Sequence, residues 1–364
     1  MDNMDAWQHF LKQQQAIFAP GADLVPDIIG FHGSTSNVVA TDVPQNFIAP
    51  LNLSGLIKAD GAEAAHFLHN QLTNDVEHLP ADQARLAGYC SVKGRLLASL
   101  LIWRHGESLC LQLPRAQVPD LQQHLQRFIM RAKVTLRDAS AEQIVLGLSG
   151  TRATTVLHHW FEILPDAPYQ MLHSDAGTLI RMADAPHATP RYQWLTSVDT
   201  AQAAWPRLIH ELQPIGATAW RLQEIQNGIP HLTAATQDRF VPQMLNYELI
   251  GGVNFQKGCY PGQEIVARSQ YLGKLKRRML CARVASTNVL TGSEVFASHQ
   301  PEQACGTIIN AELDGPNHML CLVELTLASS QNGSVHLASS DGPELIFQPL
   351  PYEIPNQAKT TLGT

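Results

Sequence analysis

The chain has 364 residues, of which 45% are hydrophobic and 16% are charged, and its formal net charge is -7. A chain of this length exceeds one ordinary domain and predicts two or three packed units, while the acidic balance argues against a general nucleic-acid-binding surface. There is no run of about eighteen apolar residues and no basic leader before an apolar run, so a cytoplasmic protein without a membrane span is predicted.

The first 45 residues predict a helix followed by a loop, as an extension outside the main units. Large apolar residues recur there at helical spacing, namely Trp7, Phe10, Leu11, Ile17 and Phe18. Pro20-Gly21 would end this helix. Residues 22–50 are rich in glycine, serine, proline and asparagine, which favours a loop with one strand.

Residues 46–140 predict a first α+β unit, and residues 141–272 predict a second. In the first unit, apolar patterns predict strands over residues 53–59, 84–91, 96–103, 109–113 and 134–138, with helices over 61–72 and 118–128. The second unit has predicted strands over 144–148, 170–173, 179–182 and 192–196, with helices over 151–161 and 200–211. This order is typical of split antiparallel α+β sheets, and its recurrence indicates an internal duplication.

Residues 217–227 predict a further helix that carries Trp220 and Glu224. Gly228 would end this helix, and Pro230 would prevent its continuation. After residue 273 the pattern changes to six short apolar runs with glycine-rich turns and no helix, which predicts a small β-barrel over residues 273–352. Residues 353–364 are expected to form a flexible tail.

Residues 257–264 form a short segment that we call the signature turn. Two glycines and a proline within five residues predict a shaped turn that presents Cys259 and Tyr260. Lys257 precedes the thiol by two residues, and nearby cations favour a thiolate over a thiol. A buried cysteine in a purely architectural turn is the alternative interpretation.

A local run of positive charge follows the signature turn. Six basic residues and no acidic residue occur between residues 265 and 292, namely Arg268, Lys274, Lys276, Arg277, Arg278 and Arg283. Such a strip is able to contact RNA phosphates, although a solvated strand edge is the commoner use of surface charge.

The cysteines and histidines give no sign of a metal site. The six cysteines include no C-x-x-C pair, so reduced thiols are expected instead of a disulfide framework or a zinc site. The histidine pairs His158-His159 and His66 with His69 have no third ligand within reach in the sequence. We therefore expect no stably bound metal.

The signature turn, Lys257-Gly258-Cys259-Tyr260-Pro261-Gly262-Gln263-Glu264, resembles the signature of the YgfZ family, bacterial folate-binding relatives of the glycine-cleavage T-protein. The family pattern is Lys-Gly-Cys-Tyr-x-Gly-Gln-Glu, and the chain meets each of its fixed positions. The resemblance extends over about residues 51–351. It implies a GcvT-like α+β fold, in which two ferredoxin-like or antiparallel sheet-and-helix units and a C-terminal β-barrel form a three-domain ring. The central hole would hold a tetrahydrofolate or another folate derivative.

The resemblance also implies how the pterin ring of a folate is held. Trp220 would line the pterin site, where an aromatic face stacks on a flat heterocycle. A core tryptophan on an amphipathic helix is the alternative interpretation. A second tryptophan of the family, on the first strand, is replaced near Ser54 in this chain, which affects the affinity for the pterin or its pose.

For the signature turn, the resemblance implies a reactive thiol at Cys259, which is our candidate catalytic residue. Lys257, Tyr260 and Arg268 would belong to the folate site. Surface ion pairing is the alternative for Lys257 and Arg268. The other fixed positions of the family pattern would shape the turn, namely Gly258, Gly262, Gln263 and Glu264.

The comparison with aminomethyltransferases bears on whether this chain is predicted to catalyse glycine cleavage. These enzymes carry an aspartate pair where this chain has Ala98 and Ser99, so glycine cleavage is not our first choice. The resemblance implies instead a folate-binding accessory protein for iron-sulphur protein assembly or repair, which indirectly supports tRNA thiomodification. The expected partners are folate, iron-sulphur client enzymes and, by weak contact, tRNA, without a membrane. A folate-dependent one-carbon transferase on an unknown substrate is the alternative.

Overall fold

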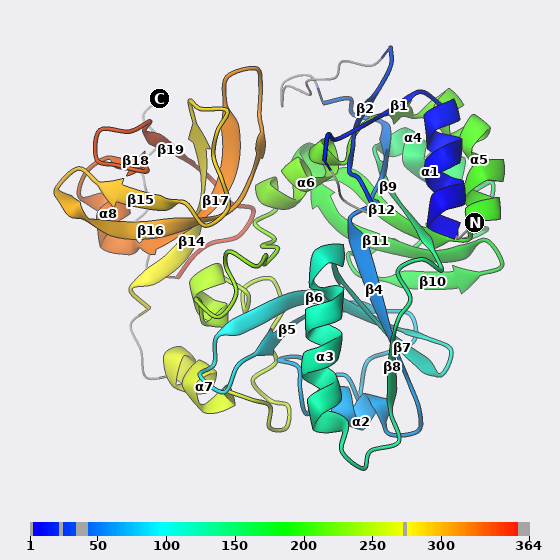
Figure 1. Ribbon diagram of the computed structural model, residues 1–364, viewed down its shortest axis with the longest axis horizontal. Coiled ribbons are helices and arrows are strands. Elements are labelled where there is room, and N and C mark those ends of the chain that lie inside the picture. The colour runs from blue at the N-terminus through cyan, green and yellow to red at the C-terminus, as the bar shows by residue number, and fades with distance from the viewer. Residues whose placement is uncertain (1–2, 22–24, 34–42, 272–274, 356–364) are drawn as a thin grey trace.

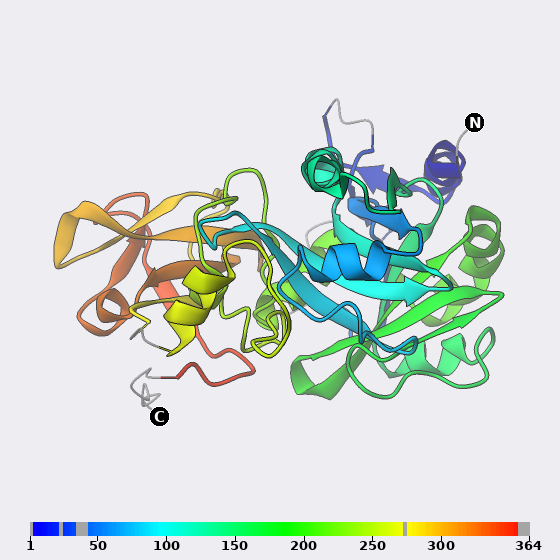
Figure 2. The same cartoon turned by 90° about the horizontal axis from the view of Figure 1, so that it is seen from below.

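A computed structural model describes residues 3–21, 25–33, 43–271 and 275–355 (Figure 1). Its strands form three large sheets and one two-stranded ribbon. The C-terminal sheet lies to one side of the other two large sheets in both views (Figures 1 and 2), and α6 (Ala217–Gln226) lies between it and the second sheet (Figure 1). The predicted boundary at residue 273 and most of the predicted flexible tail lie outside the described residues.

The first sheet is built from one continuous stretch of chain. Its elements are β4 (Ser54–Asp60), α2 (Ala64–His69), β5 (Ala84–Cys90), β6 (Leu96–His105), β7 (Ser108–Pro114), α3 (Val118–Ile129) and β8 (Thr135–Asp138). The strand order is β5-β6-β7-β4-β8, and neighbouring strands are antiparallel. These elements match the prediction, except that α2 ends before residue 72. The chain leaves the helix there because Leu72 forms a bridge with Tyr89 at the sheet edge.

The second sheet repeats this arrangement and adds one strand. It contains β9 (Ile144–Ser149), α4 (Thr151–Leu157), β10 (Met171–Ser174), β11 (Gly177–Ala185), β12 (Thr189–Thr196), α5 (Val198–Glu211) and β13 (Gln213–Pro214). The order is β10-β11-β12-β9-β3-β13, where β3 (Phe47–Pro50) is inserted between β9 and β13. The predicted duplication is thus present in the order of the strands. Residues 47–50, which we assigned to the first unit, pair in the second sheet.

The N-terminal prediction was wrong beyond the first helix. Helix α1 (Asn3–Gln13) ends before Ile17 and Phe18, which lie in β1 (Ala16–Phe18). This strand pairs with β2 (Ile28–Phe31), so the described residues between 16 and 50 hold three strands, β1, β2 and β3. Trp7 of α1 packs edge-on against Trp205 of α5, with ring centroids 5.7 Å apart, and this burial fixes the helix against the second unit.

The C-terminal region, which we predicted to be a small β-barrel, is a curled half-barrel sheet. Its strands are β14 (Arg277–Val284), β15 (Glu294–Ala297), β16 (Gln300–Leu313), β17 (Met319–Thr326), β18 (Val335–Leu337) and β19 (Leu345–Gln348). They follow the order β18-β15-β16-β17-β14-β19, so β18 and β19 remain the two ends of a half-barrel. One isolated bridge, His336 to Glu344, joins the chain near these ends. A short helix, α8 (Leu327–Gln331), also interrupts the region that we predicted to lack helices.

Two features connect the sheets. Helix α6 packs against β16, β17, β2 and β3, so it contacts both the second and the C-terminal sheets. After the 3-10 turn Pro242–Leu245, the signature turn leads into α7 (Gln263–Tyr271), a helix that the sequence analysis did not predict. Within the described ranges, no helix has the length and apolar character that crossing a membrane requires.

Candidate functional site

A cavity of about 350 Å³ lies where the three large sheets meet. Side chains from β4, β6 and β7, from β11 and β12, from β16 and from α6 line it. The walls are mainly apolar, and include Leu51, Leu86, Leu101, Met182, Ile225 and Ile229. A volume of this size with a few convergent polar groups is typical of a small-molecule site.

Trp220 reaches this cavity from α6 but is already packed on the protein. The side chain is buried, and the guanidinium carbon of Arg191 lies 4.0 Å from its ring centroid. Gly147 lies against the same indole, since a Cβ on this glycine would be 2.5 Å from Cε3 of Trp220. The ring is therefore a wall of the cavity, with much of its surface covered by Arg191 and Gly147.

A buried ion pair between Arg191 and Glu224 lies next to Trp220. Arg191 of β12 is fully buried, and its Nη2 donates to Oε1 of Glu224 on α6. Burial alone would raise the pKa of Glu224, but the charge of Arg191 and the contact with His231 hold this pKa down at about 2. Nε2 of His231 lies 3.4 Å from the second carboxylate oxygen. The cavity wall thus carries an ionised carboxylate next to a histidine.

A second charged group joins α6 to the C-terminal sheet. Nη1 of Arg221 donates to Oδ2 of Asp27 at 2.7 Å, and Nε of Arg221 donates to Oε1 of Glu312 on β16. Burial raises the pKa of Glu312, and the charge of Arg221 opposes this rise. All three side chains line the cavity.

The two serines singled out in the sequence also line the cavity. Oγ of Ser54 accepts from Nε2 of Gln112, and Oε1 of Gln112 accepts from Nε2 of Gln193, both at 2.5 Å. Oγ of Ser99 accepts from the backbone N–H of Leu232 at 3.0 Å. The hydroxyl of Ser99 is therefore already engaged as a hydrogen-bond acceptor.

Two glycines hold the signature turn against the tip of the β5–β6 hairpin. Gly262 has φ +78° and Gly94 has φ +68°. A Cβ on Gly262 would lie 2.4 Å from the backbone nitrogen of Gly94 and from the backbone oxygen of Ser91. Only backbones without a side chain approach so closely. Figures 1 and 2 both show α7, which follows the turn, beside this hairpin.

Gln263 and Glu264, which we assigned to the turn, begin α7. The backbone oxygen of Gly262 accepts from the N–H groups of Ile265 and Val266, which starts the helix. Glu264 lies in the first turn of the helix, where a negative charge is favourable. Nε2 of Gln263 donates back to the carbonyl of Gly258 at 3.4 Å. Both residues therefore help to shape the segment.

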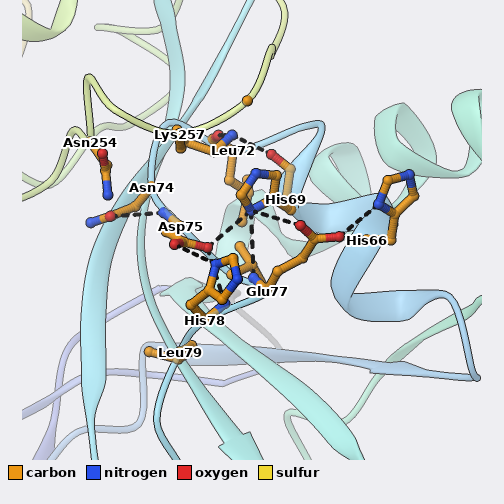
Figure 3. A network of polar contacts seen from close by, with 12 residues as sticks. His66, His69, Leu72, Asn74, Asp75, Glu77, His78, Leu79, Asn254 and Lys257 are labelled. Atoms are coloured by element: carbon orange, nitrogen blue, oxygen red, sulfur yellow. Dashed lines mark hydrogen bonds and ion pairs between the residues drawn. The ribbon is translucent and has the colours of Figure 1, made fainter.

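Lys257 anchors the other end of the signature turn to α2 (Figure 3). Its Nζ donates to the backbone oxygens of His69, at the end of α2, and Leu72. It also lies 5.0 Å from the ring centroid of Tyr260. Partial burial lowers the pKa of Lys257 to about 8. The ammonium group of this lysine donates hydrogen bonds to backbone carbonyls, and these bonds help to hold the turn in place.

The structure separates the predicted site residues into two groups. Trp220 lines the cavity, whereas Lys257, Cys259, Tyr260 and Arg268 do not. Cys259 is exposed, and Tyr260 is buried beneath the turn. The residues of the signature turn that we predicted to contact folate therefore do not line the same cavity as Trp220.

The basic run after the turn is largely paired with carboxylates. Arg277 donates to the carboxylate of Glu324 and Arg278 to that of Glu248. Arg283 forms an ion pair with Asp314, whose backbone oxygen accepts from Nη2 of the arginine. Arg268 and Lys276 are exposed, while Lys274 lies outside the described residues. The run in the sequence does not become a continuous free basic strip, because its partners come from distant segments.

The sequence analysis missed the charged residues of the cavity. Arg191, Arg221, Glu312, His231 and Asp27 were not singled out, and Glu224 was noted only for its place on a helix. The available signal was weak, because Arg191 directly precedes the predicted strand 192–196 and the observed β12 holds other polar residues as well. Among the described residues, no group of three His, Cys, Asp or Glu side chains is arranged to hold a metal ion.

The burial of Lys257 predicts a dependence of stability on pH. Because its folded pKa of about 8 lies below the ordinary value of 10.5, the unfolded chain binds more protons between these pH values. Stability therefore rises with pH in this window. We expect urea unfolding to show that wild type gains stability relative to Lys257→Met from pH 8 to 10.5. A difference between wild type and Lys257→Met that stays constant over this pH range would contradict the assignment.

The curated proteins that this chain resembles share one name. The chain is 30% identical over 317 residues to the tRNA-modifying protein YgfZ of Colwellia psychrerythraea, covering 86% of this chain and 95% of the relative. It is 30% identical over 305 residues to the tRNA-modifying protein YgfZ of Enterobacter sp., covering 82% and 91%. The protein of the same name from Serratia proteamaculans is 28% identical over 302 residues, covering 82% and 90%. No family model matches the chain.

Among solved structures, the glycine cleavage system aminomethyltransferase T of Bartonella henselae aligns with a TM-score of 0.76. The alignment covers 94% of this chain and 96% of that protein, at 15% sequence identity. This similarity shows the fold alone. The GcvT-like α+β fold, with its antiparallel sheets and curled C-terminal half-barrel, is therefore confirmed.

Proposed function

Because the chain belongs to the YgfZ family of tRNA-modifying proteins, as its relatives show, we propose that it binds a tetrahydrofolate in the cavity between the three sheets. It would act in the cytoplasm as an accessory protein for the assembly or repair of iron-sulphur enzymes, and so support tRNA thiomodification. The observation that carries this proposal is the cavity itself, which is apolar, of small-molecule size and edged by a few buried charges.

The chemistry of a reduced folate suits these walls. Its pterin ring is flat and presents several N–H donors, which match the ionised carboxylate of Glu224 and the carboxylates around Arg221. The apolar side chains and the exposed remainder of Trp220 would cover the ring. In place of a second tryptophan, Ser54 and its chain of Gln112 and Gln193 offer a polar edge, so the pterin would sit against hydrogen-bonding groups on that side.

An accessory role is favoured over aminomethyl transfer because Ser99 supplies a hydroxyl where we expect a transferase to need a carboxylate. Its hydroxyl accepts from Leu232, and a hydroxyl is a weak acid and base in any case. Direct contact with tRNA is not part of this proposal, since Arg277, Arg278 and Arg283 are paired with carboxylates. The tRNA effect would pass through iron-sulphur client enzymes.

The folate proposal is tested by calorimetry with tetrahydrofolate. We expect Trp220→Ala to weaken binding by about 5- to 150-fold, which corresponds to the roughly 1–3 kcal/mol of one aromatic contact with a base. Trp103→Phe is the control, since Trp103 is also buried but does not line the cavity. Arg268→Ala, measured alongside, tests the folate contact predicted for the region of the signature turn. No binding by wild type would contradict the proposal.

The accessory role needs a separate test in cells. A strain that lacks the protein should lose activity of iron-sulphur enzymes under oxidative stress and lose tRNA thiomodification with them. Complementation with Trp220→Ala should restore less activity than complementation with Trp103→Phe. Normal iron-sulphur enzyme activities in the deletion strain under this stress would contradict the role.

A folate-dependent one-carbon transferase is the second candidate, favoured by one observation. Glu224 and His231 lie together at the cavity wall, where a ligand and a proton-exchanging group would meet. Turnover of methylenetetrahydrofolate with an amine or thiol donor, lost in His231→Gln, would place this function first. Tight folate binding without turnover would favour the accessory role.

A further inference from the structure

The charged side chains around the cavity carry more negative than positive charge. Asp27, Glu224 and Glu312 are carboxylates, and Arg221 is the one guanidinium group among the described residues that line the space. Arg191 lies next to the wall and neutralises Glu224 through their buried ion pair. Three carboxylates therefore stand against two guanidinium groups, and one negative charge has no cation of its own.

The excess charge lies at Arg221, which binds two carboxylates at once. Its Nη1 donates to Oδ2 of Asp27 at 2.7 Å, and its Nε donates to Oε1 of Glu312. The third nitrogen, Nη2, lies 3.3 Å from Oγ1 of Thr218 and 3.4 Å from Oε2 of Glu312. All three nitrogens of the guanidinium group are thus engaged by the protein. A carboxylate of a ligand would meet two other carboxylates here, so this end of the cavity is not suited to an anion.

Both carboxylates at Arg221 are largely shielded from bulk water. The side chains of Asp27 and Glu312 are 12% and 18% exposed. Burial raises the pKa of Glu312, the charge of Arg221 opposes this rise, and the charge of Asp27 adds to it. Charges attract each other more strongly in such surroundings than in water, because less solvent screens them. A positive group on a ligand would therefore be favoured beside these carboxylates.

The charged groups belong to one wall of the cavity, which α6 and β16 form together. Arg221 and Glu224 are three positions apart on α6 and so share a face of the helix. On β16, Asn310 and Glu312 both line the cavity. Oδ1 of Asn310 accepts from the backbone N–H of His231 at 2.9 Å, and the ring of His231 contacts Glu224. This acidic wall borders a space whose other walls are mainly apolar.

We propose that the cavity selects a flat ligand that carries one delocalised positive charge, and that its preferred folate is 5,10-methenyltetrahydrofolate. The inference rests on the proposed folate site and names the one-carbon form that this site takes. Ring closure of 10-formyltetrahydrofolate takes up one proton and releases one water, and the closed ring holds a positive charge shared by its two bridging nitrogens. The open form has the same pterin and the same glutamate tail without this charge. The closed cation supplies the positive charge that Asp27 and Glu312 lack.

The test measures how the protein changes the equilibrium between the closed and open rings. 5,10-Methenyltetrahydrofolate is mixed with excess protein at pH 7, and the near-ultraviolet absorbance of the closed ring is followed until it is constant. A protein that binds both forms shifts this equilibrium by the ratio of its two affinities. We expect the ratio of closed to open ring to be about tenfold higher than in buffer, as one favourable charge contact in a partly buried site would give.

Two variants test whether the carboxylates at Arg221 cause this preference. Glu312→Gln and Asp27→Asn each remove one negative charge and keep a hydrogen-bond acceptor for the arginine. Each should bring the ratio to within about twofold of its value in buffer, because the remaining carboxylate is balanced by Arg221. Glu142→Gln is the control, since Glu142 is also paired with an arginine, Arg137, but does not line the cavity. It should keep the wild-type ratio, and circular dichroism confirms that each variant is folded.

Calorimetry with tetrahydrofolate, which has no such positive charge, separates this inference from the folate site itself. Wild type that binds tetrahydrofolate but leaves the ratio of closed to open ring unchanged would overturn the preference for a cation, while the folate site would stand. The wild-type ratio in both Glu312→Gln and Asp27→Asn would also overturn it, because the preference would then have another source. If wild type binds neither tetrahydrofolate nor the closed ring, the folate site and this inference are both wrong.

Discussion

Replacing Gly262 with alanine is expected to destabilise the protein by about 2–5 kcal/mol, the sum of a strained left-handed residue and an overpacked contact. Its φ of +78° disfavours any side chain, and the new Cβ would lie 2.4 Å from backbone atoms of Gly94 and Ser91. Neither neighbour is a flexible side chain, so the hairpin and the turn would have to separate. Equilibrium urea unfolding, followed by circular dichroism, measures the loss.

Gly251 provides a matched control for this prediction. It has the same φ of +78°, but a Cβ on it would meet nothing within 4 Å. Gly251→Ala should therefore lose only the conformational part, about 1–2 kcal/mol. Equal losses in the two variants would show that the contact between the signature turn and the hairpin contributes nothing.

Replacing Arg191 with methionine is expected to cost about 3–5 kcal/mol, because it leaves a buried carboxylate without its cation. Arg191 is fully buried and Glu224 is nearly so. The pKa of Glu224, now about 2, should rise once burial is no longer opposed by Arg191. Stability of the variant should consequently improve toward acidic pH relative to wild type, as protonation removes the unpaired charge. Urea unfolding at pH 7 and pH 5 measures both effects.

Two further variants make this prediction specific. Arg191→Met combined with Glu224→Gln removes both charges and should recover part of the loss. Arg137→Met breaks an ion pair with Glu142 in which both side chains are about two-fifths exposed, 42% and 41%, and it should cost less than about 1 kcal/mol. A loss for Arg191→Met as small as that for Arg137→Met would contradict the importance of the buried pair.

Local patterns predicted most strands because alternation and turn chemistry are properties of adjacent residues. The elements of the first unit, such as β5 and β6 around the Gly94 turn, follow directly from them. The failures occurred where distant contacts override the pattern. Ile17 and Phe18 fit a helix by spacing, but pairing with β2 places them in a strand. The C-terminal strands predicted a barrel, but whether a sheet closes depends on its end strands and not on their spacing.

The candidate site was predictable only in part for a similar reason. Trp220 was singled out through the resemblance to the YgfZ family, and the signature turn was recognised from its glycines and proline. The ion pair of Arg191 with Glu224 joins residues 33 positions apart, and the contact of Asp27 with Arg221 spans 194. Gly258 lies against His69, although the two residues are far apart in the sequence. No local pattern indicates such pairs, since the fold alone brings them together.

The position of β3 has a consequence for the order of folding during synthesis. The first unit is complete once β8 has been made, because its strands form a continuous stretch of chain. Strand β3 is made earlier, yet its partners β9 and β13 lie on the far side of that unit. During synthesis on the ribosome, the apolar strand β3 therefore has no partner strand until β9 has been made, after the first unit. Helix α1 waits in the same way for α5. The N-terminal end of this chain is thus made first but reaches these native contacts only after β9, α5 and β13 have followed the first unit.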